Sequence, residues 1–544
     1  MKRLQKFLLG VFSVVFCFGA AAFVGENTKT VSVSADTVST WEMVDGASIR
    51  TSDPTGIRFT AKISESDYTT LTAGGAEVSF GMVIMPYSYV AQYGDADTVF
   101  NADTKYTFDA NATTKVRVLH DSVNKLTTKK DGYYYLNAAL TNIAESNYEK
   151  EFYARAYYSD GTNYYFTPDN GTDNVRSVSH VAARALSDTT KNYSASVKAR
   201  LTQYATQYRV AEGSNIKLSG NYGSVTSVSI DGSAINTGAE GGTDTVYYPQ
   251  EDKTLVLASV PVGKHTAVIE NTAGEVFTVP FYRASYVIRT AADLTSMAAA
   301  ITDNASHYKL STSYIVLAQN VDYNDAKYVP TATAFAGTFD GNGHTISNLC
   351  VNGNAFLSTA TCNPTVKNII MDNLTFTSGA IRGGFVGTVG ANARFENVFV
   401  RGTNGATTAG GLLASVLTVK ASATSLGYTK NCIVIDKANY GAARKAALGD
   451  LSKVATASGA GSYDLSNVLT VTTGWSITAA KTAVDYTSSF DITQVASEEA
   501  ITAAQLQAFA TAAGAESGWL YDATTGELSL LGNVVFTASL NNAL

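Results

Sequence analysis

The sequence predicts a mainly β protein in which three regions follow one another: a β-sandwich module with terminal helices, a small immunoglobulin-like β-sandwich, and a right-handed parallel β-helix. This prediction depends on short apolar runs with a period of two, on the turn residues between them, and on an internal repeat in the second half of the chain. The composition agrees, since 45% of the 544 residues are hydrophobic and only 16% are charged. An average soluble domain has about 25% charged residues.

Residues 1–35 have the layout of a secretory signal. Basic residues precede an apolar stretch over 7–24, and small residues follow it. We expect cleavage after Ala35 and an extracellular protein that is secreted or associated with the cell surface, with no membrane span after cleavage. An uncleaved membrane anchor is the alternative, because 18 apolar residues are just long enough to span a bilayer.

Residues 36–210 are the first predicted module. Apolar and polar residues alternate over 57–63, which predicts a strand with one buried face. Asp160-Gly161 separates two apolar runs, 152–158 and 164–166. This pattern predicts a β-hairpin, because glycine accepts the positive φ of a tight turn.

A helical stretch closes this module, and a smaller β unit follows. Apolar residues spaced by three or four positions, from Val197 to Tyr208, predict an amphipathic helix. Residues 211–286 then alternate short strands with Gly and Asn turns, which predicts an immunoglobulin-like sandwich. The strands are expected at 216–218, 225–230, 254–258, 265–270 and 276–281.

Residues 287–544 contain a repeat and are predicted to form the β-helix with a C-terminal cap. A short helix is expected first, over 294–301. The repeat recurs at steps of 29 and 34 residues. Short strands that recur at such intervals predict a solenoid, whose coils bury a shared core when they stack. We expect one asparagine of each coil to join a side-chain hydrogen-bond ladder, and glycines to let neighbouring coils approach closely. The repeated asparagines are Asn368, Asn397 and Asn431, with Asn348 interpreted as an earlier copy, and the second repeated motif lies at 355–358, 384–387 and 411–414.

Two stretches of this region are specific enough to be compared with the motifs of a known protein family. Gly384-Phe385-Val386-Gly387 is similar to a Gly-Leu-any-Gly motif with Phe in place of Leu, and residues 334–346 are similar to an F-x-G-x-F-D-G-N-G-H-x-I opening. On these residues the region over 288–440 resembles secreted bacterial β-helix proteins with GLUG-type repeats. The resemblance implies a surface or secreted protein with an adhesive or carbohydrate-associated role. Residues 45–59 resemble the N-terminal module of exported proteins from gut Firmicutes.

The candidate ligand-binding residues come from tyrosines that gather in the first module. In a strand over 152–158, Tyr153, Arg155 and Tyr157 share one face, and the small residues of the other face are expected to pack inward. We therefore predict an exposed aromatic platform, because aromatic rings stack on sugar rings and a tyrosine hydroxyl adds a hydrogen bond. Cross-strand aromatic pairing that only stabilises the sheet is the alternative. The full candidate set is Tyr133, Tyr135, Tyr153, Arg155, Tyr157 and Tyr164.

No motif predicts a catalytic residue, a metal site or a cofactor. Residues 340–344, Asp-Gly-Asn-Gly-His, place an acid and a histidine at a glycine-rich turn. A polysaccharide hydrolase would need further acids on the neighbouring coil, where the sequence offers Asn368 and Asp372, so we interpret this segment as a turn. The acidic residues at 160–173 and 322–325 are interpreted as turn or cap residues and not as calcium ligands.

The charge balance narrows the expected partners. A net charge of −7 argues against a nucleic-acid partner. We expect a non-catalytic protein that binds a polysaccharide, a glycoprotein or a cell-surface ligand. A polysaccharide lyase or hydrolase acting on the β-helix face is one alternative, and a structural spacer or envelope-assembly component with a protein partner is another.

Cys350, Cys362 and Cys432 are interpreted as buried thiols, with a Cys350–Cys362 disulfide as the alternative.

Overall fold

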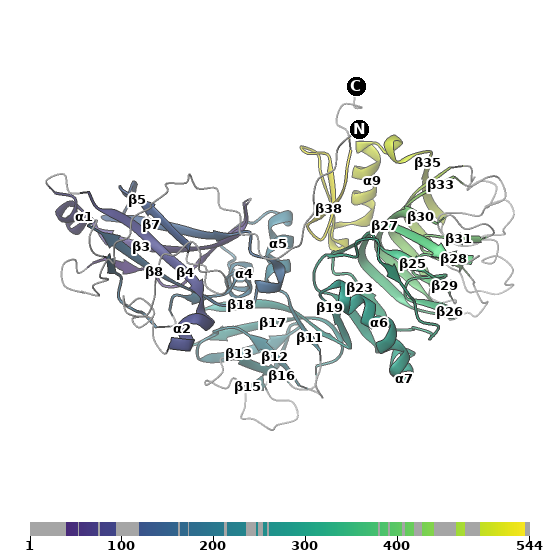
Figure 1. The fold of residues 1–544 in the computed structure, drawn as a ribbon, viewed down its shortest axis with the longest axis horizontal. Coiled ribbons are helices and arrows are strands. Elements are labelled where there is room, and N and C mark those ends of the chain that lie inside the picture. The colour runs from purple at the N-terminus through teal and green to yellow at the C-terminus, as the bar shows by residue number, and fades with distance from the viewer. Residues whose placement is uncertain are drawn as a thin grey trace.

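The computed structural model shows a mainly β chain with several sheets, as the sequence predicts (Figure 1). The predicted signal over 1–35 lies outside the described residues. The structure describes residues 40–52, 54–73, 77–93, 119–160, 164–171, 173–210, 215–235, 246–247, 254–257, 260–378, 381–389, 392–404, 409–417, 427–439, 464–473 and 490–538.

Two antiparallel sheets open the chain and share one core. The first has the strand order β1-β3-β7-β6 with β2 beside β3, and the second has the order β10-β8-β4-β5 with β9 beside β8. Trp41 joins them, since its ring centre lies 5.7 Å from that of Phe80 and 6.5 Å from that of Tyr158. The strands are β1 (Glu42–Met43), β2 (Ser48–Arg50), β3 (Gly56–Ser64), β4 (Ser79–Pro86), β5 (Leu119–Val123), β6 (Thr128–Lys130), β7 (Tyr133–Thr141), β8 (Phe152–Ser159), β9 (Tyr164–Phe166) and β10 (Val175–Arg176).

Two helices close this region, and the second is shorter than predicted. Ser194 caps the start of α5, and the helix ends at Ala205. The prediction that its apolar face continues to Tyr208 is wrong, because Tyr208 lies in β11, which pairs in parallel with β18. The helical segments up to this point are α1 (Glu65–Leu71), α2 (Tyr87–Tyr93), η3 (Glu145–Asn147), α4 (Val178–Ser187) and α5 (Ala195–Ala205).

The middle region also forms two sheets, and it continues the core of the first region. Helix α4 lies against β18, where the hydroxyl oxygens of Ser187 and Thr278 are 2.7 Å apart and the rings of His180 and Phe277 are 4.8 Å apart. The predicted boundary at residue 210 therefore divides one continuous apolar cluster. The sheet orders are β11-β18-β17-β13-β14 and β12-β16-β15. The strands are β11 (Gln207–Val210), β12 (Ile216–Ser219), β13 (Val225–Ile230), β14 (Ser233–Ile235), β15 (Val246–Tyr247), β16 (Thr254–Leu257), β17 (Gly263–Asn271) and β18 (Val276–Ala284).

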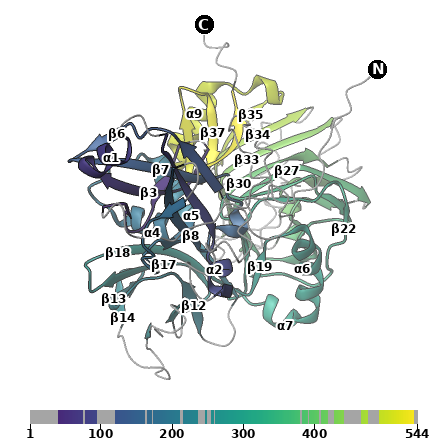
Figure 2. The same cartoon turned by 60° about the vertical axis from the view of Figure 1, so that its left-hand side comes forward.

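The third region is a stack of parallel strands (Figures 1 and 2). The predicted helix is present as α6, which begins at a capping box formed by Thr290 and Asp293 and packs Leu294 into the core of the stack. The longest sheet has the order β19-β20-β23-β27-β30-β33-β34-β35, and β26-β29-β32 and β28-β31 form two further parallel sheets. The helices are α6 (Ala291–Asp303) and α7 (Ala305–Tyr308), and the strands of the long sheet are β19 (Tyr286–Ile288), β20 (Tyr314–Leu317), β23 (Thr338–Asp340), β27 (Thr365–Ser378), β30 (Arg394–Thr403), β33 (Tyr428–Asn439), β34 (Asp464–Thr473) and β35 (Phe490–Val495). The remaining strands of the stack are β21 (Val321–Asp322), β22 (Lys327–Tyr328), β24 (Thr345–Ser347), β25 (Cys350–Asn352), β26 (Ser358–Cys362), β28 (Ile381–Gly383), β29 (Val386–Val389), β31 (Ala409–Gly411) and β32 (Ala414–Leu417).

An asparagine ladder runs along one corner of the stack, as predicted. The ladder asparagines have φ between 51° and 53°, a left-handed conformation that asparagine tolerates better than most residues. Each side-chain amide donates to the previous rung at 3.0–3.2 Å. The rungs are Asp340, Asn368, Asn397, Asn431 and Asn467.

Asn348 is not the earlier copy that the repeat predicted. Its amide donates to Asp322 at 2.9 Å, and its side-chain oxygen accepts from Asn373 at 2.8 Å, so it belongs to a second, shorter ladder. Asp340 begins the first ladder instead. Strand β27 contains both corners, at Asn368 and Asn373, and this doubling made the period ambiguous in the sequence.

The segments that contain the second repeated motif also lie side by side and are hydrogen-bonded to one another. Backbone N–H groups of Phe356 and Phe385 donate to the carbonyls of Gly384 and Leu413, each at 2.9 Å. A side chain at Gly384 would place its Cβ 1.4 Å from the carbonyl oxygen of Leu412. The motif glycine is therefore needed for the close approach of the neighbouring coil.

The C-terminal segment covers one side of the stack. Its residues Leu506 and Trp519 share a core with Ile370 and Phe399 on the outer face of the long sheet. The indole of Trp519 donates to the carbonyl of Asn431 at 3.1 Å. The segment contains β35, η5 (Glu498–Ala500), α9 (Ala503–Ala513), η6 (Ala515–Ser517), β36 (Trp519–Asp522), β37 (Glu527–Leu530) and β38 (Asn533–Thr537).

The three cysteines of the described chain are free thiols. Cys362 and Cys432 are buried as predicted, and Cys350 is half-buried. The alternative disulfide between Cys350 and Cys362 is therefore not formed. Burial raises the pKa of the Cys362 thiol to about 11 and that of Cys432 to about 12.

Candidate functional site

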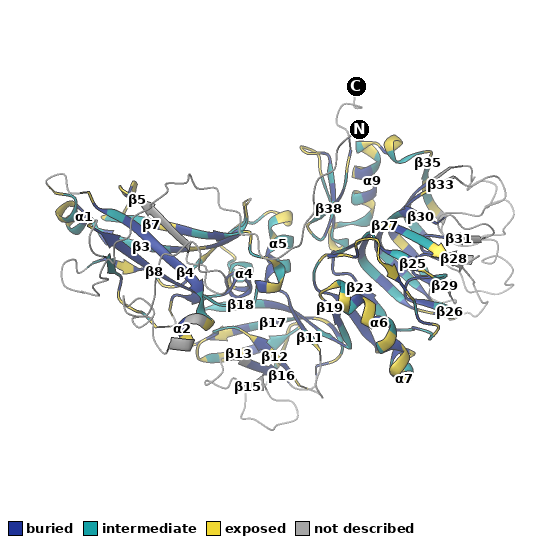
Figure 3. Ribbon diagram, viewed as in Figure 1, coloured by how far each residue is buried: buried dark blue, intermediate teal, exposed yellow. Residues whose placement is uncertain are grey.

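The predicted exposed platform on β8 is buried. Tyr153, Arg155 and Tyr157 are 1%, 3% and 0% exposed. Figure 3 shows β8 coloured as buried over most of its length. Ala154 and Ala156 pack inward as expected, so the assignment of the two faces was right. The expectation that the opposite face is open to solvent is wrong.

Local contacts explain why this second face is closed. Tyr157 fills the space above Gly81 on β4, where an added Cβ would lie 2.2 Å from the tyrosine ring. Tyr153 donates to Asp169 at 3.0 Å, and the guanidinium of Arg155 donates to the carbonyl of Thr167 at 2.6 Å. These side chains serve the structure of the sheet, which was the alternative interpretation.

Tyr164 belongs to the same structural cluster. It lies on β9 beside β8, with its ring centre 5.2 Å from that of Tyr157 in an edge-to-face arrangement. Burial raises the pKa of Tyr164. The candidate residues are thus divided between two sheets: Tyr133 and Tyr135 lie half-buried on the first, whereas Tyr164, also half-buried, packs against Tyr157 on the second.

Tyr133 and Tyr135 lie on the open face of the first sheet. Both are half-buried and point to the same side of β7, because residues two positions apart in a strand share a face. Lys62 of β3 is paired with Tyr135, and its ammonium lies 5.0 Å from the centre of the Tyr133 ring. Asn137 continues the face and is exposed. We call Tyr133, Tyr135, Lys62, Glu42 and Asn137 the tyrosine face.

The charges of the tyrosine face are partly paired. Lys62 lies 3.1 Å from the Glu42 carboxylate, and this hydrogen bond is the main cause that raises the pKa of Lys62. Asn137 accepts a hydrogen bond from the hydroxyl of Thr60 at 2.9 Å. The face therefore combines two aromatic rings with a cation, a carboxylate and an amide, which together can stack on a sugar ring and bind its hydroxyl groups.

The glycine-rich segment at 340–344 forms a turn, as interpreted, and this turn is buried at a junction between regions. Asn342 has φ 48° and Gly343 has φ 79°. Asp340 is 1% exposed and accepts hydrogen bonds from the hydroxyl of Tyr314 and from the backbone N–H of Asn342. The hydroxyl of Tyr282, from the middle region, donates to the side chain of Asn342 at 2.8 Å. The carboxylate of Asp340 thus orders the turn, and Asn342 within the turn carries the hydrogen bond to the middle region.

A glutamate from the first region meets His344 at this junction. Oε2 of Glu145 and Nδ1 of His344 are 3.7 Å apart, and neither atom has a hydrogen-bond partner among the described residues. Burial raises the pKa of Glu145 to about 7 and lowers that of His344 to about 4. Burial therefore favours the neutral carboxyl of Glu145 and the neutral imidazole of His344.

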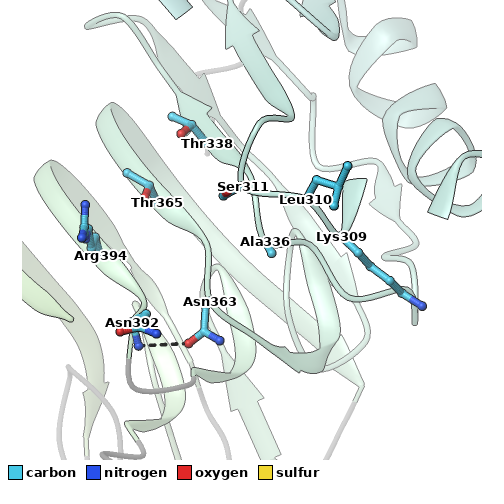
Figure 4. A pocket seen from close by; sticks show the side chains of 9 residues that line it. All are labelled: Lys309, Leu310, Ser311, Ala336, Thr338, Asn363, Thr365, Asn392 and Arg394. Carbon is cyan, nitrogen blue, oxygen red and sulfur yellow. Dashed lines mark hydrogen bonds between the residues drawn. The ribbon is translucent and has the colours of Figure 1, made fainter. Parts of the chain in front are cut away.

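A polar groove of about 510 Å³ opens on the stack (Figure 4). The side chains of Thr338, Thr365 and Arg394 stand on three successive strands and pair in register. The other lining residues are Lys309, Leu310, Ser311, Ala336, Asn363 and Asn392.

Comparison with known proteins gives no family. No protein-family model matches the chain, and no curated protein matches its sequence. Among the described residues, no three His, Cys, Asp or Glu side chains gather as a metal site would require. No helix of the described part is both long and apolar enough to cross a membrane.

Two features were not predicted from the sequence: the polar residues beside Tyr133 and Tyr135, and the groove on the stack. The signal for the first was present, because Arg58, Thr60 and Lys62 form the polar side of the strand alternation next to the tyrosines. The groove had no comparable signal. Lys309 follows α7, whereas Arg394 lies on β30, and only the stacking of coils brings them to one surface.

Proposed function

We propose that this chain is an exported, non-catalytic protein of the cell surface or the surrounding medium that binds glycans. The tyrosine face is the observation that carries the proposal. Its two half-buried rings lie on an open sheet with Lys62 and Asn137 beside them. Rings held in this way stack on sugars with little loss of side-chain freedom, and the polar neighbours supply hydrogen bonds.

In this proposal the middle region and the stack bind no ligand at the tyrosine face, and they hold the first region in place. The parallel stack is a right-handed β-helix of GLUG-type repeats, and the two middle sheets are an immunoglobulin-like sandwich. The asparagine ladder and the parallel register of successive coils support the first assignment. A solenoid of this kind adds length to a surface protein without needing a site of its own.

A glycan array with the full chain tests the function directly. We expect binding to at least one glycan and at least a tenfold weaker binding after Tyr133→Ala/Tyr135→Ala. Tyr521→Ala is the matched control, since Tyr521 is also half-buried but lies on β36 in the C-terminal segment. Thermal unfolding of each variant shows whether the fold is kept. Equal binding by the double variant and the control contradicts the proposal.

A polysaccharide-active enzyme is the second candidate function. The observation that favours it is the groove on the stack, which Lys309 and Arg394 line. Reducing-sugar release from a panel of polysaccharides, abolished by Lys309→Ala/Arg394→Gln, would support it. Asp340 does not line this groove, and its carboxylate is buried at the junction. Absence of any glycan binding, together with cross-linking to a protein in the native cell, would favour the structural spacer.

A further inference from the structure

The groove on the stack differs in charge from the rest of the chain. The full sequence carries a net charge of −7, whereas none of the nine lining residues is acidic and two of them are cations. Lys309 is exposed, and its ammonium has no ion-pair partner among the described residues. The groove is therefore a local cationic site on an acidic protein.

The floor of the groove is a row of side chains on neighbouring strands. Thr338, Thr365, Arg394 and Tyr428 occupy the same register position on β23, β27, β30 and β33. Neighbouring strands lie about 4.8 Å apart, so the row offers a polar or aromatic group at each step along the stack. In the described chain, the hydroxyls of Thr338 and Thr365 make no hydrogen bond to a protein group.

The far end of the row sets a cation on an aromatic ring. The guanidinium of Arg394 lies 5.6 Å from the centre of the Tyr428 ring, and the Tyr428 hydroxyl donates to Glu396 at 3.1 Å. Beside this end of the row, the backbone N–H of Asn392 donates to the side chain of Asn363 at 3.1 Å (Figure 4). Contacts within the protein thus order the part of the groove around Arg394.

We infer that this groove binds an anionic polysaccharide, with Lys309 and Arg394 holding the carboxylates of uronic acid residues. The inference rests on the proposed glycan-binding function and assigns a second site to it. Guanidinium and ammonium groups bind carboxylates through charge-assisted hydrogen bonds. The threonine hydroxyls of the floor and the asparagine amides beside it can bind the hydroxyl groups of successive sugars, and none of the lining residues is acidic, which avoids repulsion of an anionic chain.

Affinity gel electrophoresis and calorimetry of the full chain with polygalacturonate test the inference. We expect binding that weakens as salt rises, that falls at least tenfold in Lys309→Glu/Arg394→Gln, and that is lost with fully methyl-esterified polygalacturonate. Lys327→Glu is the matched control, because Lys327 is exposed on the same stack but does not line the groove. Lys309→Glu alone, at an exposed position, should weaken binding several-fold without altering the fold.

Specific outcomes overturn the inference. Polygalacturonate that does not bind, or that binds the groove variants and the control equally, excludes the groove as the site. Equal competition by poly-glutamate shows that an acidic peptide, and not a sugar chain, is recognised. The Tyr133→Ala/Tyr135→Ala variant is measured in parallel. Loss of polygalacturonate binding there, with the groove variants unaffected, would place the ligand on the tyrosine face and leave the proposed function intact.

Discussion

Asparagine side chains perform two tasks at the corner of the stack. They adopt a left-handed backbone conformation, and they bind the asparagine of the next coil. Asn397 is 7% exposed and Asn431 is 2% exposed, so water does not replace a lost rung. Three rungs were predictable from the sequence, because Asn368, Asn397 and Asn431 recur within similar segments at spacings of 29 and 34 residues. The rungs at the two ends, Asp340 and Asn467, were not predicted.

Removing one rung should destabilise the fold. We expect Asn397→Ala to lower the free energy of unfolding by about 2–4 kcal/mol, since it strains the corner and leaves two neighbouring amide groups unpaired. Asn142→Ala is the control, because Asn142 has φ 55° but is exposed and lies outside the ladder. We expect a loss of about 1 kcal/mol there, from the backbone alone. Urea unfolding measures both, and equal losses would show that the ladder contributes nothing.

The pair of Glu145 and His344 gives a prediction about pH. The raised pKa of Glu145 means that folding favours its neutral form, so its contribution to stability is lost as pH rises from about 4.5 to about 7. The lowered pKa of His344 means that its contribution is lost as pH falls from about 6.5 to about 4. In the unmodified chain the two effects oppose each other over the shared range.

Single substitutions should separate these effects. Relative to the unmodified chain, Glu145→Gln should become more stabilising as pH rises from 4.5 to 7, by up to about 1.4 kcal/mol per pH unit. His344→Gln should gain relative stability as pH falls from 6.5 to 4. Urea unfolding across this range, with the exposed Glu77→Gln as control, provides the measurement. Parallel stability curves for all variants would contradict the assignment.

Strand β8 shows which part of the candidate site the sequence could reveal. Its alternation identified the two faces correctly, because the small residues Ala154 and Ala156 mark the tightly packed side. Whether the other side is open depends on Gly81 of β4 and on Asp169, which are distant in the chain. The segment that contains Tyr133 and Tyr135 is as rich in tyrosine as β8, yet the face that carries these two residues stays open.

The contact between β4 and β8 can be tested at Gly81. Gly81→Ala should lower the free energy of unfolding by about 1–3 kcal/mol, because the new methyl group would overlap the buried ring of Tyr157. In the Tyr157→Leu background the ring is absent, and the same change should cost less than about 1 kcal/mol. Chemical denaturation of the four proteins gives the coupling. Additive losses would show that the ring does not occupy this space.

The predicted boundary of an element was wrong where one spacing of apolar residues continues from a helix into a strand. The helical spacing from Val197 continues to Tyr208, but the chain leaves the helix at Thr206 because β18 offers β11 a full set of backbone partners. Five strands of the middle region were predicted within three residues at either end, since turn residues such as Gly220, Gly232 and Gly274 lie next to most of them. Local signals were therefore reliable for strands bounded by turns and unreliable for a segment that joins a distant strand.

At the level of the entire chain, the C-terminal segment connects parts that the sequence keeps far apart. Asn533 donates to the carbonyl of Gly343 at 2.9 Å, across 190 residues, while α9 receives a ladder hydrogen bond from Asn467 at 3.1 Å. The order of the three regions was predictable, because each has its own pattern. The shared core of the first two and the return of the C-terminal segment were not, since such contacts leave no local trace.

Weakening this segment should therefore affect both ends of the stack. Leu528→Ala, in its buried core, should lower the free energy of unfolding by about 2–5 kcal/mol and speed amide hydrogen exchange at the 340–344 turn as well as in β34. Val534→Ala is the control, because Val534 is 53% exposed on the adjacent strand, and we expect a change below about 0.5 kcal/mol. Exchange that increases only near residue 528 would show that the two ends are not coupled.

The return of the C-terminal segment to the first turn also changes how the stack would respond to force. A solenoid open at its end loses its coils one after another when the chain is pulled from that end, because each coil contacts only its neighbours. Here a pull on the C-terminus would act first on the contact between Asn533 and Gly343, before the last coil is loaded. The first event under such a pull should therefore be the separation of the C-terminal segment from the stack, and the strands of the stack should come apart only afterwards.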